Sequence, residues 1–148
     1  MNDKTIEQEI QAKGLTAPRV TPADIEAEIV SEHYFTAGDG FAGVAALSVE
    51  EGGVIAPPEQ LDLLTFCVLV LRNGFTVTGE SACASPENFD AEIGRKIARQ
   101  NAVQKIWPLL GFRLRDDLVR SALTDADAHA DLTDAPRPDH PSQHHADP

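Results

Sequence analysis

Residues 64–82 read LTFCVLVLRNGFTVTGESA, two runs of strand-forming residues that flank Asn73-Gly74. Asn-Gly tolerates the positive φ angles of a two-residue type I′ turn, so the stretch predicts an antiparallel β-hairpin. Such a turn pairs Val70 with Val77 and Val68 with Gly79. The turn therefore also determines which side chains share a face of the hairpin.

Both faces of this hairpin are apolar. One face is predicted to be core, and it carries Phe66, Val68, Val70, Phe75 and Val77. The other face mixes leucines and Cys67 with threonines and Glu80, which is too apolar for bulk water, so we expect it to contact a partner. Since an isolated hairpin is only marginally stable, helices should cover it, and a strand from the glycine-rich region would enlarge it.

Helices are predicted on both sides of the hairpin. Thr21-Pro22 supplies an N-cap and a proline at the first helical position, which predicts a helix to about His33. Ser85-Pro86 has the same pattern and precedes an apolar stripe that runs to about Trp107. The proline at position 108 then breaks or kinks the helix, and a second helical stretch is expected over residues 112–123.

A row of small residues on the second predicted helix permits close approach of another backbone. Together with the mixed face of the hairpin, this row forms the predicted oligomer interface. Its residues are Leu69, Leu71, Thr76, Thr78, Ala91, Gly94 and Ala98.

The 148 residues suit one domain with tails. Residues 1–18 are predicted to be a flexible arm, and residues 19–123 a single α+β domain that includes a glycine-rich loop at 38–60. Residues 124–148 are rich in Asp, His and Pro and predict a disordered acidic tail. The expected fold class is α+β: a short N-terminal helix, a hairpin or small sheet, a long C-terminal helix with a proline kink, and a following helix.

The charge of the chain limits its partners. Acidic residues outnumber basic ones 24 to 12, so the net charge is -12, which disfavours non-specific binding to nucleic acid or anionic lipid. No apolar run approaches the roughly 20 residues of a membrane-spanning helix, and the N-terminus lacks the pattern of a signal peptide. Two cysteines are consistent with a reducing cytoplasm.

A small anionic ligand is still compatible with the net negative charge, because basic residues concentrate in the region that follows the hairpin. Arg95 and Arg99 lie one helical turn apart and could clamp a phosphate. Arg72 would add a contact, and Tyr34 or Phe35 would stack on a base. The alternative is a solvated helix face whose arginines pair with Glu92 or with a partner chain.

Catalytic chemistry has weaker support in the sequence. Cys83 precedes a predicted helix start that would stabilise a thiolate, and Glu80 could assist proton transfer. A buried structural thiol is the commoner state of cysteine. Residues 38–43 fit the spacing G-x-G-x-x-G, but the fingerprint requires a strand before it and a helix after it, whereas a helix and a loop are predicted here. We therefore predict no catalytic residue, no metal site and no cofactor.

Residues 61–115, together with VTPADIEAEIVSEHYFTAGDG at residues 20–40, resemble the phage gene 49/66-like family of small bacteriophage and prophage proteins. The most specific motifs are NGFTVTGESAC, SPENFD, GRKIA and the Trp107-Pro108 pair. The resemblance implies a phage or prophage origin and location in the cytoplasm of the bacterial host, and it implies no established catalytic residues. The layout is also similar to that of phage anti-defence sponges, oligomers that sequester nucleotide immune signals.

Two classes of function follow. The first is a non-enzymatic phage accessory protein that forms a homo-oligomer and binds a host protein or a small anionic ligand, in its narrowest form a nucleotide immune signal. The second is a small cysteine-dependent enzyme, which reaction of native Cys83 with iodoacetamide would reveal. A structural role in the virion is a third reading, and detection of the protein in purified particles would test it.

Overall fold

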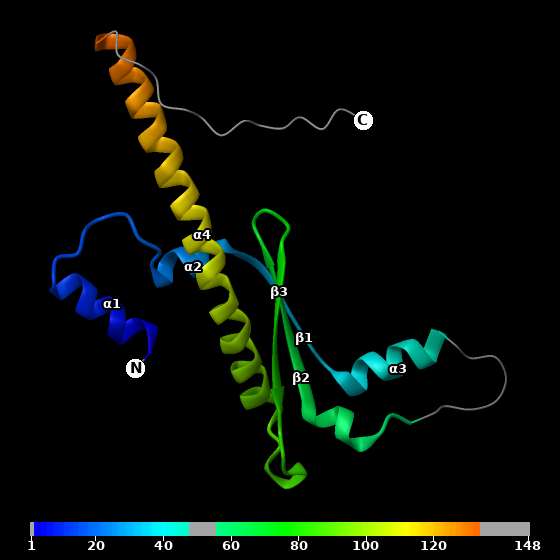
Figure 1. The fold of residues 1–148 in the computed structure, drawn as a ribbon. Coiled ribbons are helices and arrows are strands. Elements are labelled where there is room, and N and C mark those ends of the chain that lie inside the picture. The colour runs from blue at the N-terminus through cyan, green and yellow to red at the C-terminus, as the bar shows by residue number, and fades with distance from the viewer. Residues whose placement is uncertain (1, 48–55, 134–148) are drawn as a thin grey trace, which may run out of the picture. The chain divides into compact units, whose positions relative to one another are not determined.

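The computed structural model describes residues 2–47 and 56–133, and its fold is α+β, as predicted (Figure 1). The chain divides into two compact units, residues 1–110 and 111–148. In chain order the elements are α1 (Asp3–Ala12), α2 (Pro22–Glu28), β1 (Ile29–Thr36), α3 (Ala37–Leu47), the 3₁₀ turn η1 (Glu59–Leu63), β2 (Leu64–Leu71), β3 (Thr76–Ala82), the 3₁₀ turn η2 (Pro86–Asn88) and α4 (Ala91–Thr133).

The sheet has three antiparallel strands in the order β1-β2-β3. Its third member, β1, comes from residues that were predicted to continue a helix to His33. That helix starts as predicted, because Thr21 and Asp24 form a reciprocal capping box, but α2 ends at Glu28. From Ile29 onward the chain pairs with β2 instead, so tertiary pairing overrides the helical pattern of the sequence.

The hairpin lies where it was predicted, but its register is shifted by one residue. Leu69 pairs with Val77 and Cys67 with Gly79. The loop has three residues rather than two: the Leu71 N–H donates to the Phe75 carbonyl at 2.8 Å, and Gly74 has a φ of 85°. Glycine thus serves as the left-handed residue of a bulged turn, not as the second residue of a type I′ turn.

This shift exchanges the two faces of β2. The predicted outer residues Cys67, Leu69 and Leu71 are buried, whereas the predicted core residues Phe66, Val68 and Val70 are only half-buried. The residues of α4 up to 110 cover the buried face with small side chains, among them Ala98 and Ala102. Glycine is required at position 79 because a Cβ there would overlap the backbone of α4.

Several predicted boundaries were wrong. The predicted loop at 38–60 contains α3 and η1, and residues 48–55 lie outside the described part. The long helix starts after Asp90, whose carboxylate accepts from the Ile93 N–H at 2.9 Å, instead of at Ser85. The helix does not end at Pro108 but continues to Thr133. Residues 124–133 of the predicted tail are therefore helical. The remainder of that tail, 134–148, lies outside the described residues.

Candidate functional site

The face of the sheet opposite α4 is open to solvent. None of the residues on this face is buried. Its central row comes from β2, and the flanking positions come from β1 and β3 according to the register. The residues are Ser31, His33, Phe35, Leu64, Phe66, Val68, Val70, Thr76, Thr78, Glu80 and Ala82.

The middle of this open face is apolar. Phe35 stacks on Phe66 with ring centroids 5.5 Å apart, and 41% of Phe35 remains exposed. Val68 and Val70 continue the row along β2. Polar groups lie at the two edges, with His33 on β1 and Glu80 on β3. A flat apolar row with a polar rim is the usual composition of a protein interface.

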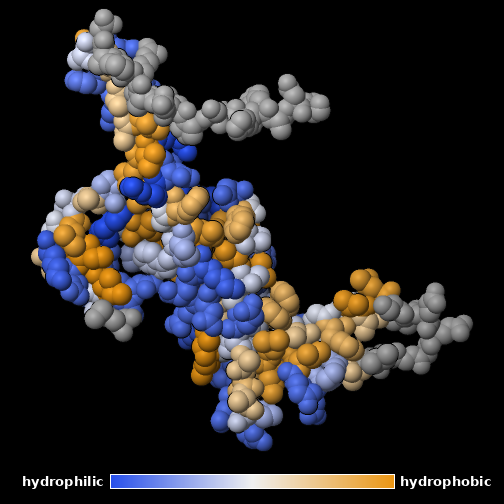
Figure 2. Space-filling view, viewed as in Figure 1, coloured by the Kyte–Doolittle hydropathy of each residue, from blue (hydrophilic) through white to orange (hydrophobic). Residues whose placement is uncertain are grey.

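Helix α3 adds further exposed apolar surface. Leu47 is 90% exposed and Val44 is also largely exposed, and Figure 2 shows hydrophobic side chains over this helix. The start of α3 is capped by its own residues, because Thr36 and Asp39 exchange hydrogen bonds of 2.9 and 3.0 Å.

The G-x-G-x-x-G spacing at 38–43 was rejected as a dinucleotide site because a helix was predicted before it and a loop after it. The structure instead has a strand, β1, before these residues, and the helix α3 follows that strand. The glycines nevertheless lie inside α3 rather than in a phosphate-binding turn, and β1 belongs to an antiparallel sheet, so the rejection itself holds.

Arg99 joins α4 to α2 and β1. Its Nε donates to Glu32 at 2.7 Å, and its two Nη atoms donate to Glu26 at 3.2 and 2.9 Å. Glu32 also accepts from the Tyr34 hydroxyl at 2.9 Å. Burial opposes ionisation of Glu32, but the hydrogen bonds from Arg99 and Tyr34 lower its pKa. All three guanidinium nitrogens of Arg99 therefore already donate to carboxylates of its own chain.

The other predicted ligand residues do not assemble into one site with Arg99. Arg72 lies in the hairpin loop, where its Nη2 donates at 2.9 Å to Glu28, a carboxylate that is only 1% exposed. Tyr34 and Phe35 are adjacent in β1 and so point to opposite faces of the sheet, with Tyr34 facing α4. Arg95 is exposed on α4. Arg99 thus pairs with acidic side chains of its own chain, but these are Glu26 and Glu32 instead of Glu92, and its side chain is only 29% exposed.

The residues of the predicted oligomer interface do not lie on one surface in the structure. Leu69, Leu71, Gly94 and Ala98 are buried inside the chain itself, where the small residues of α4 contact the sheet instead of a second molecule. Thr76 and Thr78 lie on the open face, and Ala91 is exposed at the start of α4.

Cys83 and Glu80 are also separated. Glu80 lies on the open face, while Cys83 is half-buried and its thiol donates to the Ser85 carbonyl at 3.1 Å. Burial raises the pKa of the second thiol, Cys67. In the part of the chain that the structure describes, no cluster of three or more His, Cys, Asp or Glu could hold a metal ion.

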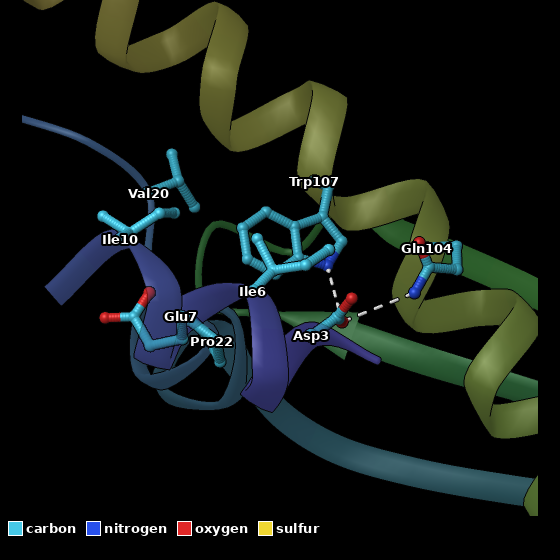
Figure 3. Close-up of a pocket in the computed structure, with 8 residues that line it drawn as sticks. All are labelled: Asp3, Ile6, Glu7, Ile10, Val20, Pro22, Gln104 and Trp107. Atoms are coloured by element: carbon cyan, nitrogen blue, oxygen red, sulfur yellow. Dashed lines mark hydrogen bonds between the residues drawn. The ribbon is translucent and has the colours of Figure 1, made fainter. Parts of the chain in front are cut away.

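A pocket between α1 and α4 was missed by the sequence analysis (Figure 3). Ile6 and Ile10 of α1 form one wall and Trp107 of α4 another. The Trp107 indole N–H donates to Asp3 at 3.2 Å, across 104 positions of sequence. The spacing of the two isoleucines was the only available signal, and it did not indicate what the helix would contact.

Comparison with known proteins identifies the origin of the chain. The family described as Phage protein (N4 Gp49/phage Sf6 gene 66) matches residues 20–118. The chain belongs to this phage protein family. The match confirms the resemblance seen in the sequence and spans α2 to the middle of α4. No match was found among the curated proteins or the solved structures. In the described part of this phage protein, no helix is both long and apolar enough to cross a membrane.

Proposed function

We propose that this phage protein is a non-enzymatic accessory protein that acts in the host cytoplasm. It self-associates through the open face of its sheet, and the assembly binds a host protein or a small anionic ligand. The observation that carries the proposal is the row Phe35, Phe66, Val68 and Val70, which lies on a face where no residue is buried. Domains normally cover both sides of an apolar sheet, so this row favours a partner.

A second copy is the occupant that the chemistry of the face favours. His33 lies at one edge and Glu80 at the other. A two-fold axis parallel to the strands places β1 of one copy over β3 of the other, so that each imidazole approaches the carboxylate edge of its partner. The face is therefore complementary to itself in its polar edge groups as well as in its apolar centre.

Counter-defence sequestration of a nucleotide signal is the narrower form of the proposal. Because Arg72 and Arg99 already bind carboxylates, a phosphate would rely on Arg95, which is exposed on α4. Calorimetry with cyclic and ADP-ribose-type nucleotides tests this form. Saturable heat that Arg95→Ala abolishes supports it, and absence of heat with every nucleotide removes it.

Sedimentation velocity tests self-association. We expect the wild-type protein to dimerise with increasing concentration and Val68→Glu to remain monomeric, because the new charge would be buried between two sheets. Gln100→Glu introduces the same charge at an exposed position of α4 and should dimerise normally. Circular dichroism verifies that both variants are folded. A wild-type monomer at every concentration, or a dimer of folded Val68→Glu, would overturn the proposal.

A further inference from the structure

We propose that the pocket between α1 and α4 binds a small organic cation with an apolar body, such as an alkylamine. The pocket has a volume of about 250 Å³ and lies entirely within the first unit. Pockets for drug-sized ligands usually have about 300–1,000 Å³, so the ligand is smaller than that. The site is separate from the open face of the sheet and does not depend on self-association.

The walls of the pocket are mostly apolar. Ile6 and Ile10 come from α1, Val20 and Pro22 from the segment that leads into α2, and Trp107 from α4 (Figure 3). These side chains can bury a hydrocarbon chain, and the indole ring offers a face to a cation.

The charged groups that line the pocket are both acidic. Glu7 is already neutralised, because Arg19 donates to its two carboxylate oxygens at 2.6 and 2.7 Å. Asp3 accepts from Trp107 at 3.2 Å and from Gln104 at 3.5 Å, and both of these bonds use the same oxygen, Oδ2.

Among the residues that the structure describes, none donates to the second oxygen, Oδ1, so a ligand can donate to it. Among the described residues, no lysine or arginine lines the pocket. A cation is attracted there and a carboxylate or phosphate is repelled. This preference is opposite to that of the anion site predicted from the arginines.

The side chains of α1 do not fill this pocket. No residue of α1 is buried, and Ile6 is 42% exposed although it faces Trp107. The helix is held mainly by polar contacts, namely Glu7 with Arg19 and Asp3 with Trp107. A helix that served only to close the core would bury its isoleucines, so the space beside them suits a ligand.

The intrinsic fluorescence of the protein tests the proposal directly, because Trp107 is the only tryptophan in the chain. The full-length protein is titrated with n-butylammonium chloride, with sodium butyrate as the probe of opposite charge and ammonium chloride as the control for ionic strength. We expect a saturable change in tryptophan emission with butylammonium alone.

Three variants locate the site. Asp3→Asn keeps an acceptor for Trp107 but removes the charge, and should weaken butylammonium binding about five- to tenfold. Ile10→Ala removes part of the apolar wall and should also weaken it. Glu9→Gln makes the matching change at an acid that pairs with Lys13 outside the pocket, and should bind as the wild type does.

Circular dichroism checks that α1 remains helical in each variant. The proposal is overturned if emission does not saturate, if butyrate or ammonium produces the same change, or if folded Asp3→Asn binds butylammonium as tightly as the wild type.

Discussion

Gly79→Ala tests the close contact between β3 and α4. In β3 an added methyl group would overlap the Ala98 carbonyl oxygen and the Ala102 backbone nitrogen, and would lie 3.0 Å from the Ala102 Cα. These are helix backbone atoms, so no side-chain rotation can relieve the overlap and α4 must move away from the sheet. Overpacking of a core costs about 1–3 kcal/mol, and an obstruction by backbone belongs at the upper end of that range.

A loss of about 3 kcal/mol is a large part of the 5–15 kcal/mol that stabilises a typical domain. For a unit of this size it lowers Tm by roughly 10 °C. Urea and thermal unfolding followed by circular dichroism measure both quantities. Gly43→Ala is the matched control: nothing lies within 4 Å of the added carbon in α3, and better helix propensity should stabilise that variant slightly. If Gly79→Ala is as stable as the wild type, β3 does not approach α4 as described.

Two further predictions concern the hairpin loop and the network around Arg99. Gly74→Ala should lower the free energy of unfolding by about 1–2 kcal/mol in urea titrations, because its φ of 85° is unfavourable for alanine; an unchanged midpoint would contradict the bulged turn. Because the folded state lowers the pKa of Glu32, its contribution is present at neutral pH and is lost as the pH falls below about 5. Glu32→Gln should therefore flatten part of the acid-induced loss of stability measured by urea unfolding at pH 7 and at lower pH, and an identical pH profile would argue against the bond from Arg99.

The local signal at Thr21 predicted the start of α2 better than its end. The capping box of Thr21 and Asp24 involves residues three apart, and the structure contains it. The end of α2 and the start of β1 depend instead on pairing with β2, for example of Glu32 with Leu69, which is distant in sequence. The helix predicted to run to about His33 therefore extended into residues that form a strand.

The one-residue error in the predicted register of the hairpin arises at its turn. Asn73-Gly74 is compatible with a two-residue turn and with a three-residue loop that ends in a left-handed glycine. The two alternatives differ by one residue in register, and β2 is apolar on both faces, so hydrophobic alternation could not choose between them. In the observed register Cys67, Leu69 and Leu71 of β2 lie on the same face as Val77 and Gly79, and this is the face that packs against α4.

The candidate sites also depend on residues that are distant in sequence, which local patterns do not reveal. Arg99 was predicted to bind an anion because it lies one helical turn from Arg95, whereas its acidic partners Glu26 and Glu32 come from α2 and β1. The pocket at Trp107 joins residues about a hundred positions apart, so no local pattern could indicate it.

The helix that covers the sheet is encoded after all three strands, and this order has a consequence for synthesis. When Ala82 leaves the ribosome, the leucines of β2 still lack residues 91–110 above them. At about 5–20 residues per second, translation of the missing stretch takes roughly 1 to 6 seconds. During that interval the nascent sheet exposes apolar side chains on both sides, so the newly made chain is most exposed to aggregation, and most dependent on chaperones, just before its last helix emerges.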